Sequence, residues 1–138
     1  MPLYAFDERV NCCDKPLPYL QEQYIEGVKP MIMEMRVYRC LPGRLPALMK
    51  RFDTLTLKLW DKHGIKQAGF YTTLIGTSNQ ELTYFVAWES LADREKKWTA
   101  FQSDPDWIAG RAKSEEDGQI IDNIVSQLLV PTAFSAVK

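Results

Sequence analysis

The sequence predicts an α+β fold in which two helices cover one face of a four-stranded antiparallel sheet. The first observation is that the spacing of the apolar residues changes along the chain, in the order strand, helix, strand, strand, helix, strand. The second is that a short turn joins the two middle strands, which therefore form a hairpin. This βαββαβ order is the split βαβ, or ferredoxin-like, arrangement, which leaves the other face of the sheet without helices.

The first strand, 32–39, has two unlike faces, because successive side chains of a strand point to opposite sides of a sheet. Glu34, Arg36 and Tyr38 form a polar row on one face. The opposite face is apolar and consists of Met31, Met33, Met35 and Val37. We expect the apolar face to meet the helices and the polar row to lie on the open face.

The first helix begins after "LPG" and ends at His63 and Gly64. Pro46 falls in the first turn, where its missing N–H is tolerated, and Gly64 is the expected left-handed cap. The apolar positions with helical spacing are Leu45, Leu48, Met49, Phe52, Leu55 and Leu59.

The hairpin strands are predicted at 65–75 and 81–88, and "GTSNQ" between them is typical of a turn. Both faces of the strand at 81–88 are largely apolar, so both need cover. We assign Phe70 to the helix side of the sheet and Tyr71 to the open side.

The open face is then expected to be aromatic. It would carry Tyr38, Tyr71, Tyr84 and Trp88 beside the polar row. Monomeric soluble proteins rarely expose an aromatic, apolar surface of this size to water. A second copy of the same sheet would cover it, and the sequence therefore predicts a homodimer, arranged as a two-fold dimeric α+β barrel.

The second helix is predicted from its caps. Ser90 and Asp93 resemble a capping box, and Asp104 followed by Pro105 restarts the helix. The last strand spans about 120–130. The apolar residues of this region that we expect in the core are Trp98, Phe101 and Trp107.

Length and composition fit one globular domain. The chain has 138 residues with a net charge of −1, so no electrostatic grip on nucleic acid is expected. No apolar stretch is long enough to insert into a membrane, and the N-terminus lacks the apolar run of a signal peptide. With three cysteines, an odd number, a reducing, cytoplasmic location is expected. We divide the chain into an arm, 1–30, irregular or with one short helix, and a domain, 31–138.

Most kinds of catalytic and cofactor site have no support in the sequence. His63 is the only histidine, and its place in the last helical turn favours a structural role. One histidine and no C-x-x-C leave too few ligands for a zinc site. Glycine-rich nucleotide motifs and G-x-S-x-G are missing as well. We therefore predict neither a metal nor another cofactor.

Five blocks of the sequence carry a specific resemblance. They are "MEMRVYRCLPGRLPALMKRF", "KHGIKQAGFYTTLIG", "AWESLADREKKW", "DPDW" and "LLVPTAFS". In this order and spacing they resemble the NIPSNAP family over about 33–135. The resemblance implies the dimeric α+β barrel superfamily, whose members include antibiotic-biosynthesis monooxygenases and other small enzymes acting on cyclic substrates.

The resemblance also suggests residues. The family's E-x-R-x-Y element falls on Glu34, Arg36 and Tyr38, its His-Gly on 63–64, and its aromatic third strand on Tyr84 and Trp88. The family pattern implies His and Trp at the places of 84 and 86, so no catalytic histidine is carried over. Animal members associate with mitochondria and vesicle traffic. This chain lacks an Arg-rich transit segment, and a bacterial-type cytoplasmic member is expected.

Two functions remain open from the sequence. In the first, Glu34, Arg36 and Tyr38 bind a small aromatic, carbonyl or anionic molecule in the barrel, with the Arg36 guanidinium as anchor. The walls of that site would be Tyr71, Tyr84 and Trp88. The protein would be a binder or a cofactor-independent enzyme without an assigned catalytic residue. In the second, the protein is a non-enzymatic interaction module, and Glu34 and Arg36 only pair across the sheet or dimer.

Overall fold

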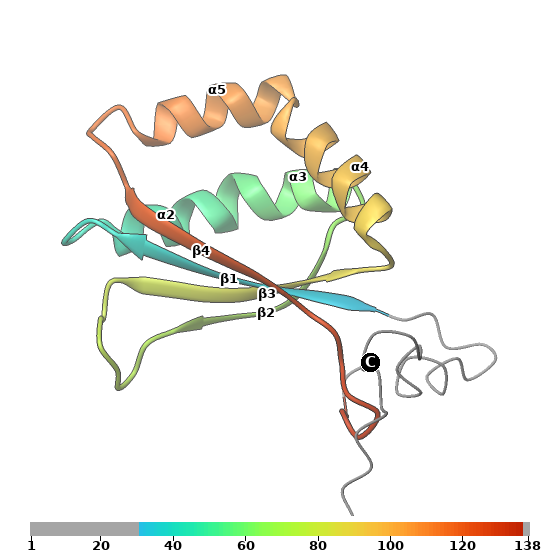
Figure 1. Cartoon of the computed structure of the whole chain (residues 1–138). Helices are drawn as coiled ribbons and strands as arrows, with labels where there is room; N and C mark the ends of the chain where they lie inside the picture. Colours follow the sequence, from blue (N-terminus) through green and yellow to red (C-terminus); the bar gives the residue numbers. More distant parts are fainter. Residues whose placement is uncertain (1–30, 137–138) are drawn as a thin grey trace, which may run out of the picture.

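The computed structural model describes residues 31–136, which form one sheet with a layer of helices (Figure 1). The strands are β1 (Ile32–Cys40), β2 (Lys66–Thr72), β3 (Glu81–Trp88) and β4 (Ile121–Leu129). They lie in the order β2-β3-β1-β4, and all neighbours are antiparallel. In Figure 1 the described helices all lie on one side of the sheet. The predicted α+β fold with its ferredoxin-like order is confirmed, while the predicted arm, 1–30, lies outside the described residues.

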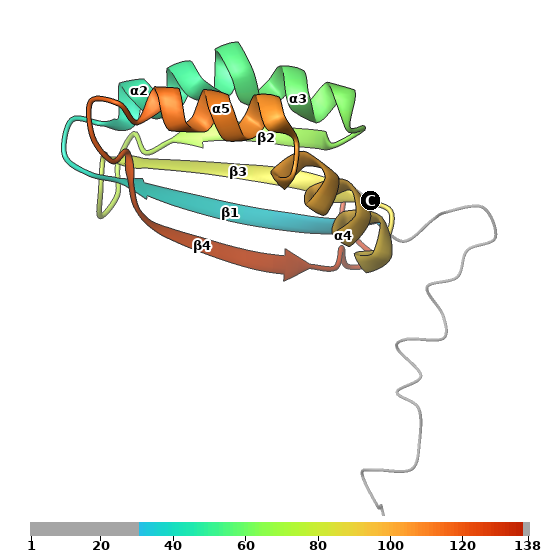
Figure 2. The same cartoon turned by 90° about the horizontal axis from the view of Figure 1, so that it is seen from above.

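The helical layer has two parts. The helix α2 (Leu45–Arg51), the π-helical turn η1 (Phe52–Thr56) and α3 (Leu57–Lys62) follow one another directly and make up the first predicted helix. The second part is α4 (Leu91–Gln102) followed by α5 (Pro105–Ser114), and Figure 2 shows α5 running beside the first part.

The π turn has a cause in the sequence. Leu48, Phe52, Thr56 and Trp60 are all buried and recur every four residues. An α-helix has 3.6 residues per turn, so a strict spacing of four drifts around it. The wider π turn compensates for this drift and keeps all four side chains on the face that meets the sheet.

The predicted helix ends are confirmed. The Ser90 hydroxyl accepts a hydrogen bond from the Asp93 backbone N–H at 3.0 Å, and an Asp104 carboxylate oxygen accepts one from the Asp106 N–H at 2.9 Å. Gly64 follows α3 with φ +68°, in the left-handed region that glycine favours.

The predicted assignment of the sheet faces is wrong for β1 and β3. Glu34 lies opposite Val86 and Arg36 opposite Tyr84, and directly opposed residues share a face. These residues are buried under the helices and not on the open face. The buried alternate residues of β3 are Leu82, Tyr84, Val86 and Trp88.

The open face of the sheet therefore carries the methionine side of β1. Its apolar residues are Met33, Met35, Val37, Tyr71, Phe85, Ala87, Val125 and Leu129. The physical reason for the error is that both faces are apolar enough to be covered, so alternation separates the two sets without showing which one meets the helices.

The assignment of β2 is confirmed for Phe70 and Tyr71, whereas Gln67, expected on the same face as Tyr71, lies opposite the buried Val86 on the helix side. The register with β3 shifts between Gln67 and Phe70, around Gly69, which has φ +126°. Beyond this bulge the Phe70 ring stacks on Tyr84 in the core, with ring centroids 5.0 Å apart. Tyr71 lies on the open face, where its ring contacts Phe85.

The core lies between the sheet and the helices and is strongly aromatic. Phe101 and Trp107 are buried and Trp98 is partly buried against them, as predicted. The largest fully buried side chains are Trp60, Trp88, Tyr84 and Phe101. None of the helices within 31–136 is long and apolar enough to cross a membrane.

Candidate functional site

Glu34 is the centre of a buried polar network under the helices. One carboxylate oxygen, Oε1, accepts hydrogen bonds from Arg36 at 2.7 Å, Arg94 at 2.9 Å and Ser126 at 2.7 Å. The other, Oε2, accepts from the Trp88 indole N–H at 2.9 Å and from Arg94 Nε at 2.7 Å. The carboxylate is thus saturated with donors, as a fully buried charge requires.

The network keeps Glu34 ionised. Burial alone raises the pKa of a carboxyl group, but the hydrogen bonds from Arg94, Ser126 and Arg36 outweigh it and lower the pKa of Glu34 to about 2. The same contacts raise the pKa of Arg94, chiefly through its hydrogen bonds to Glu34. At neutral pH the network therefore holds one negative and two positive charges.

Arg36 is held from several sides and is only 8% exposed. Besides its bond to Glu34, it donates from Nε to the Tyr84 hydroxyl at 2.9 Å and from Nη2 to the Tyr38 hydroxyl at 3.3 Å. Its guanidinium carbon lies 4.7 Å from the centre of the Trp98 ring. These contacts fix the orientation of the Arg36 side chain.

The two tyrosines beside Arg36 differ in environment. Tyr84 is completely buried, and burial, followed by the nearness of Tyr38, raises the pKa of its phenol. It is therefore a neutral phenol at working pH. The Tyr38 ring packs edge-on against it, with centroids 5.2 Å apart, and is partly exposed.

A pocket of about 150 Å³ lies between the sheet and the helices, next to this network. Arg36, Tyr38 and Tyr84 form the wall on the sheet side. The other lining residues are Arg51, Phe52, Thr56, Trp60, Trp98, Phe101, Gln102, Trp107, Arg111, Ile121 and Ile124. Among these described residues there are three arginines but no Asp, Glu or His, so the pocket is aromatic and carries positive charge.

The first helical segment supplies an unpaired donor to this pocket. Phe52 and Thr56, at the two ends of the π turn η1, and Trp60, one turn later, all line it. The indole Nε1–H of Trp60 is buried and has no hydrogen-bond partner in the described structure. Buried donors are nearly always paired, so this N–H, on a residue of the pocket wall, is an unused donor.

The structure brings together only part of the predicted site. Glu34, Arg36, Tyr38 and Tyr84 form one cluster, but on the helix side of the sheet. Trp88 joins it through Glu34 without lining the pocket, whereas Tyr71 lies on the open face and takes no part. Whether these residues bind a ligand stays a prediction.

Sequence reasoning missed the helix side of the pocket. Arg51, Thr56, Trp60 and Arg111 line the pocket from the helices, and none of them is among the residues that the sequence predicts for the site. One signal was available in the sequence. Leu48, Phe52, Thr56 and Trp60 recur every four residues, a spacing that favours a π turn, and π turns are common at functional sites.

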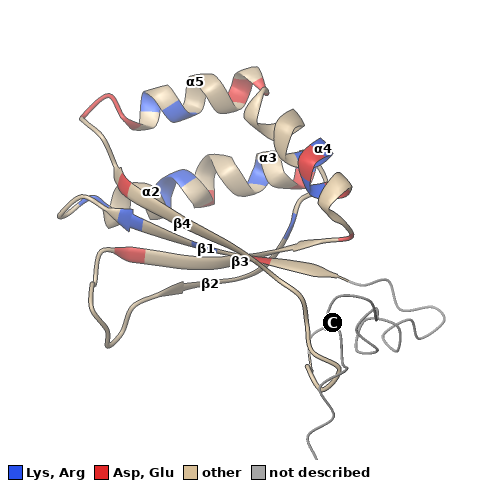
Figure 3. Cartoon of the chain, in the orientation of Figure 1, with Lys and Arg blue, Asp and Glu red and all other residues tan. Residues whose placement is uncertain are grey.

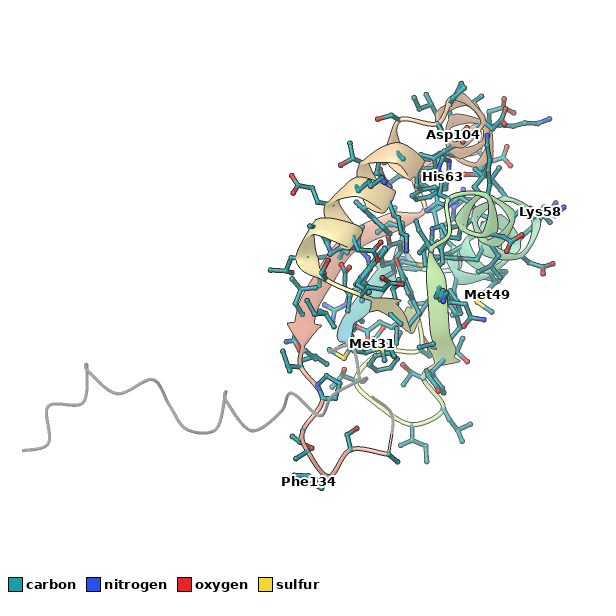
Figure 4. All side chains as sticks on the ribbon, turned by 90° about the vertical axis from the view of Figure 1, so that its right-hand side faces the viewer. Met31, Met49, Lys58, His63, Asp104 and Phe134 are labelled. Atoms are coloured by element: carbon teal, nitrogen blue, oxygen red, sulfur yellow. The ribbon has the colours of Figure 1, made fainter. Side chains whose placement is uncertain are left out.

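His63 lies outside the pocket and has a structural partner. Its Nε2 is 2.7 Å from Oδ2 of Asp104, and Figure 4 shows the two residues next to each other. The Lys62 ammonium group lies 2.8 Å from the same oxygen. The hydrogen bonds from Lys62 and then from His63 lower the pKa of Asp104. This cluster connects the end of α3 to the start of α5, in agreement with a structural role.

Comparison with known proteins identifies the fold. The family model described as NIPSNAP matches residues 33–136. A NIPSNAP family protein of unknown function from Agrobacterium tumefaciens str. C58 is 25% identical with a TM-score of 0.70, over 80% of this chain and 96% of that one. An uncharacterized NIPSNAP-like domain protein from Burkholderia xenovorans is 21% identical with a TM-score of 0.69, over 78% and 90%. No curated protein matches the chain.

Proposed function

The chain belongs to the NIPSNAP family, and from this premise we propose that it binds a small anionic molecule with an aromatic or cyclic body between its sheet and its helices. The observation that carries the proposal is the pocket beside Arg36. It offers guanidinium groups and an unpaired indole N–H, but no carboxylate that would repel an anion, among the described residues.

The charge of the wall favours an anion. The bidentate contact of Arg94 with Glu34 balances the Glu34 carboxylate, which leaves the charge of Arg36 without a full partner. A buried charge is stabilised by a counter-charge that also accepts hydrogen bonds. Arg51 and Arg111 also line the pocket, and both pair with the single carboxylate of Glu115, at 3.2 and 3.9 Å, so the lining keeps an excess of positive charge.

The size of the pocket limits the ligand. A cavity of about 150 Å³ accommodates a molecule of roughly the size of benzene. The ring of a benzoate fits this size and the aromatic walls, and its carboxylate would lie beside the ring, where Arg36 can bind it.

Binding of benzoate and salicylate, followed by titration calorimetry, tests the proposal. Arg36→Ala should abolish binding, and Arg111→Ala should weaken it by up to about five-fold, because an exposed charge contact contributes about 1 kcal/mol or less. Arg39→Ala is the matched control, since Arg39 lies on the same strand but pairs with Glu81 at the surface. Equal binding by wild type and Arg36→Ala, with circular dichroism showing both folded, would reject the proposal.

We also propose that the protein is a homodimer built through the open sheet face. That face is apolar, and the exposed fractions of Tyr71 and Val125 are 58% and 44%. A contact over four strands would reach the roughly 1,000 Å² of a biological interface, with two-fold symmetry.

The dimer has a matched pair of variants. Met35→Lys introduces a charge on the open face, whereas Met49→Lys introduces the same charge at the periphery of the helical layer (Figure 4). Light scattering should show a monomer for Met35→Lys and a dimer for Met49→Lys. A wild-type monomer at micromolar concentration contradicts the proposal.

Binding fits the pocket better than catalysis. Its titratable groups, apart from the arginines, are the phenols of Tyr38 and Tyr84, and a raised pKa keeps Tyr84 protonated. A phenol that stays protonated does not act as a general base, so Tyr84 does not serve as one. The alternative, a non-enzymatic interaction module, predicts that native mass spectrometry of freshly purified protein finds no retained small molecule. A cytoplasmic location stays a prediction from the sequence.

A further inference from the structure

A second cavity, of about 490 Å³, lies between α2 and α5. Its apolar part is formed by Ala47, Leu55 and Gly110. Gly110 allows the close approach of the helices there, since a Cβ atom on it would lie 2.5 Å from Leu55 Cδ2. The groove therefore has a closely packed floor between two helices.

The rim of this groove is basic. Arg44, Lys50, Arg51 and Lys113 line it, against one acidic residue, Asp117. Figure 3 shows the Lys and Arg residues on α2 and on α5. Within 31–136, Arg44, Lys50 and Lys113 form no ion pair, whereas Arg51 pairs with Glu115 at 3.2 Å. The groove thus holds an excess of positive charge that the described residues do not balance.

Two guanidinium groups of this groove also have an unused donor. Arg44 donates from Nη2 to the Gly118 carbonyl at 2.8 Å, and Arg51 donates from Nη1 to Ser114 at 3.3 Å. Their Nε–H groups are buried without an acceptor in the described structure. Arg51 is only 4% exposed, so its head is fixed in a place where water cannot freely replace the missing partner.

We propose that this groove binds a multiply charged oxyanion, of the kind that a dissolved phosphorylated small molecule presents. A phosphoryl group offers several acceptor oxygens on one centre, which suits fixed guanidinium donors with lysines around them. This groove is distinct from the pocket beside Arg36, because Lys50, Lys113 and Arg44 do not line that pocket. Arg51 lies in the walls of both.

Inorganic pyrophosphate is the probe for this site, with calorimetry on the full chain at low ionic strength. We expect saturable binding that salt weakens. The double variant Lys50→Ala/Lys113→Ala should raise Kd about ten-fold, because each exposed charge contact contributes modestly. Arg44→Gln, which removes one unpaired Nε–H, should raise Kd as well.

The matched control is Lys58→Ala/Lys96→Ala, which removes the same charge from exposed lysines that line none of the described pockets. It should leave Kd unchanged. Equal weakening by both double variants, or no saturable binding by wild type, would overturn the proposal. If the protein sediments with vesicles of phosphatidylcholine and phosphatidic acid but does not bind pyrophosphate, the assignment to a dissolved ligand is wrong.

Discussion

Replacement of Glu34 by glutamine tests the buried network directly. The substitution keeps the shape of the side chain but removes the charge that Arg36 and Arg94 share. A fall in the pKa of Glu34 from 4.5 to about 2 corresponds to about 3 kcal/mol of folding free energy at neutral pH. We therefore expect Glu34→Gln to lower the free energy of unfolding by about 3 kcal/mol at pH 7.

The pH dependence gives this prediction a distinctive signature. Since the pKa of Glu34 is lower in the folded than in the unfolded chain, its contribution is complete above about pH 5.5 and is lost as the pH falls toward 2. The difference between wild type and Glu34→Gln should therefore shrink to less than half between about pH 6 and pH 3. Other carboxylates titrate in both proteins, and their effects cancel in the difference.

Urea unfolding at several pH values, with tryptophan fluorescence and one fixed protein concentration, measures this difference. Glu81→Gln is the control, because Glu81 pairs with Arg39, whose side chain is 53% exposed. Such a surface pair contributes less than about 1 kcal/mol. If Glu34→Gln costs no more than Glu81→Gln, or costs the same at pH 3 and pH 7, the network is not the stabilising centre that its geometry indicates.

Three further predictions concern the frame of the site. Ser90→Ala should lower the free energy of unfolding by about 1 kcal/mol, because it removes the N-terminal cap of α4. Ser103→Ala, at the exposed other end of that helix, should change the free energy of unfolding little, and equal effects of the two variants would contradict the role of the cap. Gly64→Ala should cost about 1 kcal/mol, because alanine disfavours φ +68°, and an unchanged urea midpoint would show that the turn adapts. Deletion of 1–30 should leave a folded domain by circular dichroism, and an insoluble product would place the domain boundary earlier.

The order of the strands and helices could be predicted from the sequence because their signals are local. Ser90, Asp104 and Gly64 act on backbone groups within a few residues, and the structure has each cap where the sequence indicated it. The hairpin and its turn follow for the same reason. Local chemistry of this kind does not depend on what lies across the core.

The orientation of the sheet could not be predicted from alternation. The sequence favours an open-face position for Glu34 and Arg36 because the opposite, methionine side of the strand is apolar and is expected to meet the helices. Their burial depends on Arg94 and Ser126, which lie 60 and 92 residues further along the chain than Glu34. The hydrogen bonds that make the buried position stable are therefore long-range, and a pattern along one strand contains no trace of them.

The same long-range network bears on the binding that we propose for the pocket. Arg94 occupies the Glu34 carboxylate from the helix side, so Arg36 shares that carboxylate while it is held by Tyr38 and Tyr84. If Arg94 were absent, Glu34 and Arg36 would form a neutral pair, and the sheet side of the wall would contribute less to the proposed preference for an anion. The preference for a negative ligand thus follows in part from a helix residue that does not line the pocket. The proposed binding therefore depends on the charges of Glu34, Arg36 and Arg94 together, and not on the β1 residues alone.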